Sequence, residues 1–309
     1  MRLPQAAPGA TAVSCLITLL LPVCARAQST PAAQSPAITL ILSGGYRGRV
    51  EGCGCPSGLT GGLAHRAALQ RELFPQGQPV GLDCGGLLDL DPDLGKLNSR
   101  CAILGLARLG LKVVGVVPRD LFYGVEFLRG LADTTGIKLA SANLVDTGNR
   151  ERLFSDWVEV DANGRRIAVT SLSAYEPERR ITGFYGWTVL PPDSVMDVIS
   201  LNLRNGVDFT VLLTDMGEGA LRGLLIKYQM FDLVVSSGRQ FQTTEPFTVG
   251  KTVVVHPAPD GRALEWVTMD GERTGGNRCE YHNQPVLQNR RLEKETRSWL
   301  EGCLGRNIR

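Results

Sequence analysis

Cysteines at short spacing are the first residues of this chain that could do chemistry. Cys53 and Cys55 lie in a segment, Glu51 to Arg66, that reads E-G-C-G-C-P-S-G-L-T-G-G-L-A-H-R, and Cys84 follows further along the chain. Cysteines in such a cluster can form disulfides, hold a metal ion as thiolates, or work as a redox-active pair. The glycines beside them favour tight backbone turns.

Apolar runs typical of strands alternate with segments typical of helices from Ile38 onward. Strands are expected at Ile38–Leu42, Pro79–Leu82, Lys112–Val117, Ile137–Ala142, Phe209–Leu213, Leu233–Val235 and Val253–Val255. Helices are expected at Gly62–Phe74, Leu97–Leu109, Tyr123–Ala132, Asp193–Arg204 and Glu218–Gln229. The pair Asn163-Gly164 predicts a hairpin with arms at Trp157–Val160 and Arg166–Leu172. The fold class is therefore an α/β sandwich with mixed strand pairing.

These elements place the cysteines. The C-G-C-P loop follows the first expected strand, and Cys84 ends the second. Because the carboxyl ends of parallel strands meet at one edge, Cys53, Cys55 and Cys84 should lie close together, with Cys101 on the next helix. We favour bridges from Cys53 and Cys55 to Cys84 or Cys101, since a bridge between Cys53 and Cys55 would close a small, strained ring. A four-thiolate metal site and a redox-active pair are the alternatives, although C-x-C departs from the usual zinc spacing.

Residues 1–27 have the features of a secretion signal. A basic start precedes an apolar run from Ala12 to Val23, and the segment ends in Ala25-Arg26-Ala27, a small-x-small cleavage pattern. We expect cleavage after Ala27 and export to the periplasm or the extracellular space. A lipid anchor at Cys24 is not expected, because valine precedes it where a small residue is needed. No transmembrane span is expected, because the apolar run is too short.

Charge and composition exclude several function classes. The chain of 309 residues has 33 Lys+Arg and 31 Asp+Glu, a formal charge of +2. That balance argues against a nucleic-acid partner, which would favour a basic surface. With 43% hydrophobic and 21% charged residues, the composition is that of a globular protein. After a flexible lead-in over residues 28–37, we expect one domain over residues 38–270.

A short tail, residues 271–309, is expected to be helical, with a helix from Pro285 to Leu300. Of the eight cysteines, Cys15 and Cys24 lie in the signal, which leaves six. An even number of cysteines in an oxidising compartment is typical of disulfides. A bridge from Cys279 to Cys303 would pin the tail helix.

Five segments resemble, in order, motifs of the calcineurin-like metallophosphoesterases, in particular the 5′-nucleotidase-like branch. Gly110–Gly124 reads G-L-K-V-V-G-V-V-P-R-D-L-F-Y-G and is similar to that branch's G-Y-D-A-V-x-x-G-N-H-E-F-D-Y-G. The other segments are Leu82–Gly86, Leu139–Leu144, Val211–Gly217 and Asp232–Gln240. The C-G-C-P loop itself resembles one found in a subgroup of exported members. The resemblance implies a four-layer αββα sandwich with mixed sheets.

The positions at which the family binds two divalent metals hold different residues here. Gly45 and Arg47 occupy the positions of the family's D-x-H, Gly86 occupies that of the bridging Asp, and Pro118-Arg119 occupies that of Asn-His. Asp215 occupies the position of a His, and Gly238 and Gln240 occupy those of the last histidines. A one-residue shift of the last motif would put Arg239 and Phe241 there instead. The three histidines, His65, His256 and His282, fall at none of these positions.

The resemblance therefore implies a family member that has lost its metal ligands, and we expect neither a metal nor another cofactor. The remaining carboxylates, Asp83, Asp120 and Asp215, lack nitrogen partners. Arg47, Arg119 and Arg239 would surround the former metal site. They could hold an anion such as a phosphate or carboxylate. Alternatively, they pair with Asp120 and Asp215 and neutralise the former metal hole.

We expect an exported, metal-free pseudoenzyme that acts as an accessory or interaction subunit of another exported protein, such as a redox complex. Two alternatives belong to other function classes. A hydrolase of phosphate esters or nucleotides would use Asp83, Asp120 and Asp215. An anion-binding carrier would use the arginines.

Overall fold

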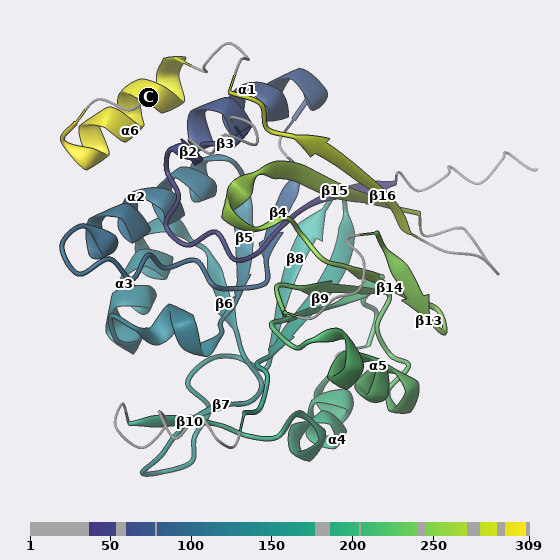
Figure 1. Cartoon of the computed structure of the whole chain (residues 1–309). Helices are drawn as coiled ribbons and strands as arrows, with labels where there is room; N and C mark the ends of the chain where they lie inside the picture. Colours follow the sequence, from purple (N-terminus) through teal and green to yellow (C-terminus); the bar gives the residue numbers. More distant parts are fainter. Residues whose placement is uncertain are drawn as a thin grey trace, which may run out of the picture. The chain divides into compact units, whose positions relative to one another are not determined.

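Two six-stranded sheets form the centre of the computed structural model of this chain (Figure 1). The structure describes residues 37–53, 60–77, 79–176, 186–203, 205–239, 245–270, 279–288 and 294–306. All of them belong to one compact unit, residues 35–309. The expected signal and all of the lead-in except residue 37 lie outside the described residues.

The first sheet has the strand order β16-β15-β1-β4-β5-β6. Its members are β1 (Ile38–Ser43), β4 (Val80–Asp83), β5 (Leu111–Gly115), β6 (Lys138–Ala140), β15 (Ala263–Met269) and β16 (Cys279–Pro285). The strands β1, β4, β5 and β6 run parallel, as β-α-β connections require. The last two strands of the chain add to β1 in antiparallel fashion.

The second sheet has the order β13-β14-β12-β11-β9-β8. Its members are β8 (Trp157–Ala162), β9 (Arg165–Leu172), β11 (Phe209–Thr214), β12 (Leu233–Ser236), β13 (Phe247–Val249) and β14 (Thr252–Val255). The hairpin β8–β9 turns at Asn163 and Gly164, both with positive φ, which confirms the expected turn. Two short pairs, β2 (Gly52–Cys53) with β3 (Thr60–Gly61) and β7 (Leu144–Asp146) with β10 (Trp187–Val189), lie outside the main sheets.

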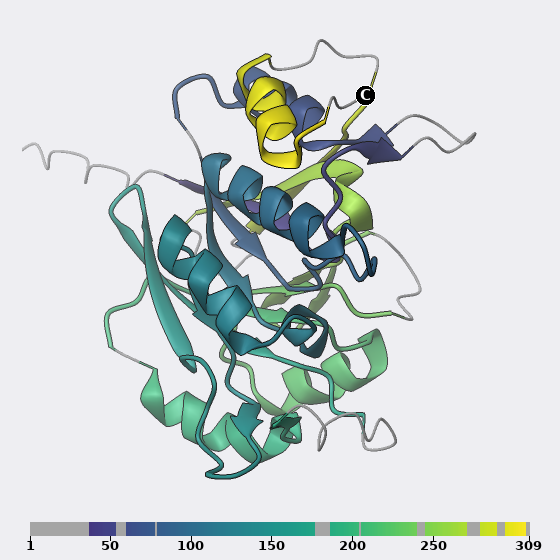
Figure 2. The same ribbon diagram turned by 90° about the vertical axis from the view of Figure 1, so that its left-hand side faces the viewer.

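Helices cover the outer faces of both sheets. The helices α1 (Leu63–Leu73), α2 (Gly95–Arg108), α3 (Val125–Thr135) and α6 (Lys294–Leu304) belong to the layer over the first sheet. The helices α4 (Pro192–Asn202) and α5 (Glu218–Lys227) pack on the second. Short 3₁₀ turns, η1 (Pro118–Leu121) and η3 (Pro259–Gly261), occur in loops. The expected four-layer αββα sandwich with mixed sheets is confirmed (Figures 1 and 2).

The pattern of burial along β11 shows how the layers are held together. Val211 and Leu213 point into the core between the two sheets. Leu212, between them in sequence, packs under α4 and α5. All three side chains have no exposed surface. Because successive side chains of a strand point to opposite faces, a continuous apolar run is what a strand buried on both faces needs.

The tail differs from its expected structure. Cys279–Pro285 is a strand, and the helix begins only at Lys294. Cross-strand pairing with β15 decides this: Tyr281 Oη donates to Glu265 Oε1 at 3.0 Å, and His282 stacks on Trp266 with 5.0 Å between ring centroids. The prediction of a helix from Pro285 to Leu300 was therefore wrong for residues 285–288, and it is confirmed for residues 294–300.

Candidate functional site

Loops that follow the parallel strands of both sheets meet at one end of the sandwich. Ser237, after β12, donates from Oγ to the carbonyl of Cys84, after β4, at 3.2 Å. Ser173, after β9, donates to the carbonyl of Val116, after β5, at 3.3 Å. Because ligands of open α/β sheets bind beyond the carboxyl ends of strands, this end is the candidate site.

Asp83, the last residue of β4, is fully buried beneath the site. Ser43 Oγ donates to its Oδ2 at 2.6 Å, and the backbone N–H of Gly85 donates to its Oδ1 at 2.8 Å. Burial raises the pKa of this carboxyl to about 7, although both hydrogen bonds oppose the shift. Asp83 is therefore largely protonated below neutral pH.

Asp120, in η1, is also fully buried. Its carboxyl group accepts three backbone N–H donors, from Leu87 at 2.7 Å, Gly86 at 2.9 Å and Val117 at 3.2 Å. Burial raises the pKa of Asp120 and the three donors lower it. The carboxyl group thus ties the loop after β4 to the loop after β5, which is a structural role.

Asp215, the residue after β11, lies across the site from Asp83 on the second sheet. The backbone N–H of Ala174 donates to its Oδ1 at 2.6 Å. Burial raises the pKa of Asp215 to about 6. The three carboxyl groups that sequence reasoning selected are therefore gathered at one end of the sandwich, each held by at least one backbone donor.

The three candidate arginines also lie at this end. Arg47 Nη1 lies 3.8 Å from Asp260 Oδ1. Arg119 Nε donates to the carbonyl of Leu88 at 3.1 Å, and Arg239 is exposed. Burial lowers the pKa of Arg119, and the positive charges of Arg47 and Arg239 lower it further. The positive charges of Arg47 and Arg239 thus both act on Arg119, which is a local concentration of positive charge.

The structure does not support the expected pairing of the arginines with Asp120 and Asp215. Backbone N–H groups satisfy both carboxyl groups, and the ion pair of Arg47 goes to Asp260 instead. Arg119 acts on Asp120 through its charge, which lowers the pKa of that carboxyl. A buried carboxyl group needs hydrogen-bond donors of fixed geometry. Here nearby backbone N–H groups supply those donors, and the flexible arginine side chains do not.

Sequence reasoning missed Asp260, which is the acid that the arginines of this face surround. Only 8% of its surface is exposed, and its φ of 61° is in the left-handed region. Arg49 Nε lies 3.9 Å from Oδ1 and Arg262 Nη2 lies 3.4 Å from Oδ2. The sequence around Asp260 reads P-D-G, which predicts a turn and nothing more.

The disulfide pairing differs from both expected arrangements. Cys101 on α2 is bonded to Cys303 on α6, with 5.9 Å between Cα atoms. The predicted bridge from Cys279 to Cys303 was wrong, as was a bridge from Cys53 or Cys55 to Cys101. Cys279 lies in the core between the sheets, with Sγ 3.9 Å from the carbonyl of Asp232, whereas Cys101 lies in the helical layer. The first sheet separates the two.

The bridge from Cys53 or Cys55 to Cys84 is not present either, because Cys84 is a free, buried thiol. Burial raises the pKa of that thiol well above its usual value, which is the opposite of what a redox-active cysteine needs. Cys53 ends β2, and Cys55 lies outside the described residues.

Two histidines have structural contacts. His256 Nδ1 lies 2.7 Å from the carbonyl of Ser236. His65 is buried on α1, and its Nε2 lies 3.1 Å from the carbonyl of Gln288. Burial lowers the pKa of both imidazoles, so they are neutral near pH 7.

The residues at this end do not fit the pair of divalent metals that the fold implies. Both oxygens of Asp83 and of Asp120 already accept hydrogen bonds. Gly86 and Arg119 stand at positions where the resemblance expects ligands, and neither side chain can bind a cation. Within the part of the chain that the structure describes, no group of three or more His, Cys, Asp or Glu is placed to hold a metal ion.

Comparison with solved structures places the fold among the calcineurin-like phosphoesterases. Neither family models nor curated proteins match the chain. The sulfate thiohydrolase SoxB of Thermus thermophilus, in complex with glycerol, matches with a TM-score of 0.71 at 17% identity, over 89% of this chain and 61% of that one. A 5′-nucleotidase precursor from Thermus thermophilus matches with a TM-score of 0.66 at 17% identity, over 87% of this chain and 59% of that one. The phosphoesterase YfkN of Bacillus subtilis matches with a TM-score of 0.67 at 14% identity, over 87% of this chain and 99% of that one.

The chain therefore has the calcineurin-like phosphoesterase fold, which it shares with 5′-nucleotidases. It spans about 60% of the length of the SoxB and 5′-nucleotidase chains that it matches. At these identities the likeness concerns the fold alone. Among the described residues, no helix is long and apolar enough to cross a membrane.

Proposed function

We propose that this chain is an exported, metal-free pseudoenzyme of the phosphoesterase fold that docks on another exported protein as an accessory subunit. The observation that carries the proposal is the use of the site's carboxyl groups. Asp120 accepts three backbone donors and Asp83 accepts two hydrogen bonds, so both serve the architecture of the loops rather than a metal.

The surface at the site supports docking. Phe122, after η1, has 47% of its surface exposed, and Tyr175, after β9, has 45%. Arg119 is close in sequence to Phe122, and Arg47 lies close enough for its charge to act on Arg119. Exposed aromatic residues beside arginines are the composition typical of interface hot spots. A partner that covers this face should carry acidic groups.

Export is supported by two observations. The disulfide between Cys101 and Cys303 is of the kind that persists in oxidising compartments. The signal-like sequence of residues 1–27 would deliver the chain to such a compartment. The exported partner, for which a redox complex remains our expectation, would be in that compartment too.

Docking is tested by crosslinking the tagged mature chain in native extract. We expect a partner that binds the wild type and is lost when Phe122→Ala and Tyr175→Ala are combined. The matched control is Leu201→Ala, because Leu201 on α4 is 85% exposed and lies away from the site. Recovery of the wild type as a lone monomer under gentle salt, or equal capture by all variants, would refute the proposal.

A hydrolase is the alternative that the names of the solved relatives favour. It would act on phosphate esters or nucleotides through Asp83, Asp120 and Asp215. We expect less than about a tenth of a metal ion per purified chain, even when manganese is offered. We also expect turnover of a phosphodiester and nucleotide panel to equal the buffer blank. A rate that Asp215→Ala abolishes would make the hydrolase the leading function.

An anion-binding carrier is the second alternative, and the positive charges of Arg47 and Arg239 near Arg119 favour it. Bidentate guanidinium contacts would hold a phosphate or carboxylate. In this case inorganic phosphate should raise the melting temperature of the wild type but not that of Arg119→Gln. The control is Arg129→Gln on α3, whose side chain pairs with Glu126.

A further inference from the structure

A cavity of about 240 Å³ lies between α1, α2 and α6, away from the candidate site. Phe74 follows α1 on the way to β4, and Leu109 follows α2 on the way to β5. Both residues line the cavity, so it opens near the amino ends of these strands. Asp83 and Asp120 lie beyond the carboxyl ends of the same strands. The cavity is therefore separate from the candidate site and lies at the opposite end of the strands of the first sheet.

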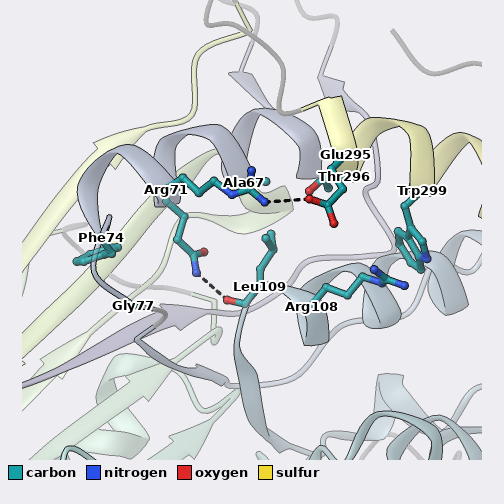
Figure 3. A pocket seen from close by; sticks show the side chains of 10 residues that line it. Ala67, Arg71, Phe74, Gly77, Arg108, Leu109, Glu295, Thr296 and Trp299 are labelled. Carbon is teal, nitrogen blue, oxygen red and sulfur yellow. Dashed lines mark hydrogen bonds and ion pairs between the residues drawn. The ribbon is translucent and has the colours of Figure 1, made fainter.

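Figure 3 shows cationic and aromatic side chains around the cavity. Arg71 Nη2 lies 3.4 Å from Glu295 Oε2, and both side chains are exposed. The guanidinium carbon of Arg108 lies 4.6 Å from the centroid of the Trp299 ring. The two guanidinium groups bring positive charge to the wall of the cavity, which suits a carboxylate. Since an exposed ion pair contributes at most about 1 kcal/mol, a ligand carboxylate can engage Arg71 at small cost.

Gln70 supplies the second feature of a binding site. It lines the cavity, and only 4% of its surface is exposed. Its Nε2 donates to the carbonyl of Leu109 at 2.7 Å, which fixes the orientation of the amide. Its Oε1 is buried and has no hydrogen-bond partner among the described residues. A buried, unpaired acceptor costs about 1–3 kcal/mol, so a ligand donor that reaches this oxygen from the cavity would be favoured.

We propose that this cavity binds a small monocarboxylate that also carries a hydroxyl or amino group. The carboxylate lies toward Arg71 and Arg108, and the hydroxyl or amino hydrogen is donated to Gln70 Oε1. The apolar body of the ligand lies against Phe74, Leu109 and Trp299. At roughly 30 Å³ per water, the cavity has room for about eight waters, which suits a ligand of about ten non-hydrogen atoms.

The probe is 4-hydroxybenzoate, titrated by calorimetry into the mature chain, with benzoate and inorganic phosphate as comparison ligands. We expect saturable binding of 4-hydroxybenzoate, and binding of benzoate about tenfold weaker because it lacks the donor. Phosphate should not compete. The absence of saturable binding of 4-hydroxybenzoate up to about 10 mM would overturn the proposal. Equal binding of all three ligands would also overturn it, since it would indicate a general anion surface.

Single substitutions test which residues of the cavity contact the ligand. Arg108→Gln should weaken 4-hydroxybenzoate binding about tenfold, whereas Arg100→Gln, an exposed arginine on the same helix that does not line the cavity, should not. Gln70→Met should remove the preference for 4-hydroxybenzoate over benzoate. Melting curves establish that each variant folds. Identical affinities for Arg108→Gln and Arg100→Gln would place the ligand elsewhere and refute the site.

Discussion

At the scale of single residues, the candidate site consists of acids that the fold has buried. Asp83 keeps a proton until about pH 7 because it is fully buried at the end of β4. Asp215, on the facing sheet, keeps one until about pH 6. A metal pair would need these groups ionised and open to a ligand. Their environment instead favours the neutral acid, which agrees with a structural role.

Burial of Asp83 makes stability depend on pH. The folded chain keeps a proton that the unfolded chain releases near pH 3.8, so the free energy of unfolding should fall as pH rises from about 4 to about 7. The loss is at most about 4 kcal/mol. In Asp83→Asn the profile from urea titrations should be flatter over this range. Asp133→Asn, an exposed carboxylate on α3, should keep the wild-type profile. A variant Asp83→Asn with the wild-type slope would contradict the assignment.

Gly85 is one of the residues at which the site tolerates no side chain. Its φ is +87°, and an added Cβ would lie 2.5 Å from the carbonyl oxygen of Gly115 and 2.9 Å from Asp120 Oδ2. Gly85→Ala should cost about 3 kcal/mol or more by chemical denaturation. Gly136→Ala is the control, because φ there is +72° and nothing lies within 4 Å. It should cost about 1 kcal/mol. An equal loss of unfolding free energy in Gly85→Ala and Gly136→Ala would mean that the close contacts around Gly85 do not affect stability.

At the scale of elements, the position of α6 depends on contacts with helices that are distant in sequence. Leu300 is fully buried in the core of the helical layer. Gly105 of α2 also faces α6, where an added Cβ would be in ordinary contact with the Trp299 ring at 3.4 Å. Cys101 and Cys303, which are 202 residues apart in sequence, join α2 and α6. Figure 2 shows α6 beside α1 at the same end of the layer.

Removal of this bridge tests how α6 is held. The double variant Cys101→Ser, Cys303→Ser should lose about 2–5 kcal/mol of unfolding free energy, because the bridge closes a very long loop. It should also weaken 4-hydroxybenzoate binding, since α6 carries one wall of the cavity. Non-reducing peptide mapping is the direct check on the pairing. A peptide that links Cys279 to Cys303 would show our assignment to be mistaken.

At the scale of the whole molecule, the last segment of the chain completes the first sheet. The strand β16 covers the edge of β15 along its full length, from Ala263 to Met269. Glu265 accepts hydrogen bonds from Tyr281 Oη and Asn283 Nδ2, both on β16. Without β16, the strand β15 would be an exposed edge, and the buried Glu265 would keep, among the described residues, only the backbone N–H of Ala258 as a donor.

Truncation after Asp270 should therefore not yield a stable domain. We expect the shortened chain to be insoluble, or to melt well below the mature chain with an intact C-terminus, as followed by circular dichroism. A soluble truncated chain with the same melting temperature would support the boundary at residue 270 that the sequence resemblance implies. It would also show that β16 and α6 are dispensable additions.

The sequence by itself determined the alternation of strands and helices and the hairpin at Asn163, and its resemblance to the phosphoesterases implied the four layers. The alternation and the hairpin follow from local periodicity and turn chemistry, which a single chain segment carries. The sequence also showed that glycine and arginine stand where the family expects ligands, at positions such as Gly86 and Arg119.

Only the tertiary structure decided the partner of Cys303, the arginines around Asp260 and the unpaired oxygen of Gln70. Each depends on which face of a sheet or helix two distant segments share, and no local pattern records that. Cys279 and Cys101 look equivalent in sequence, yet the first sheet lies between them. The same holds for Asp120, because two of its three backbone donors come from a loop more than thirty residues away. Long-range packing, rather than residue type, decided what these groups do.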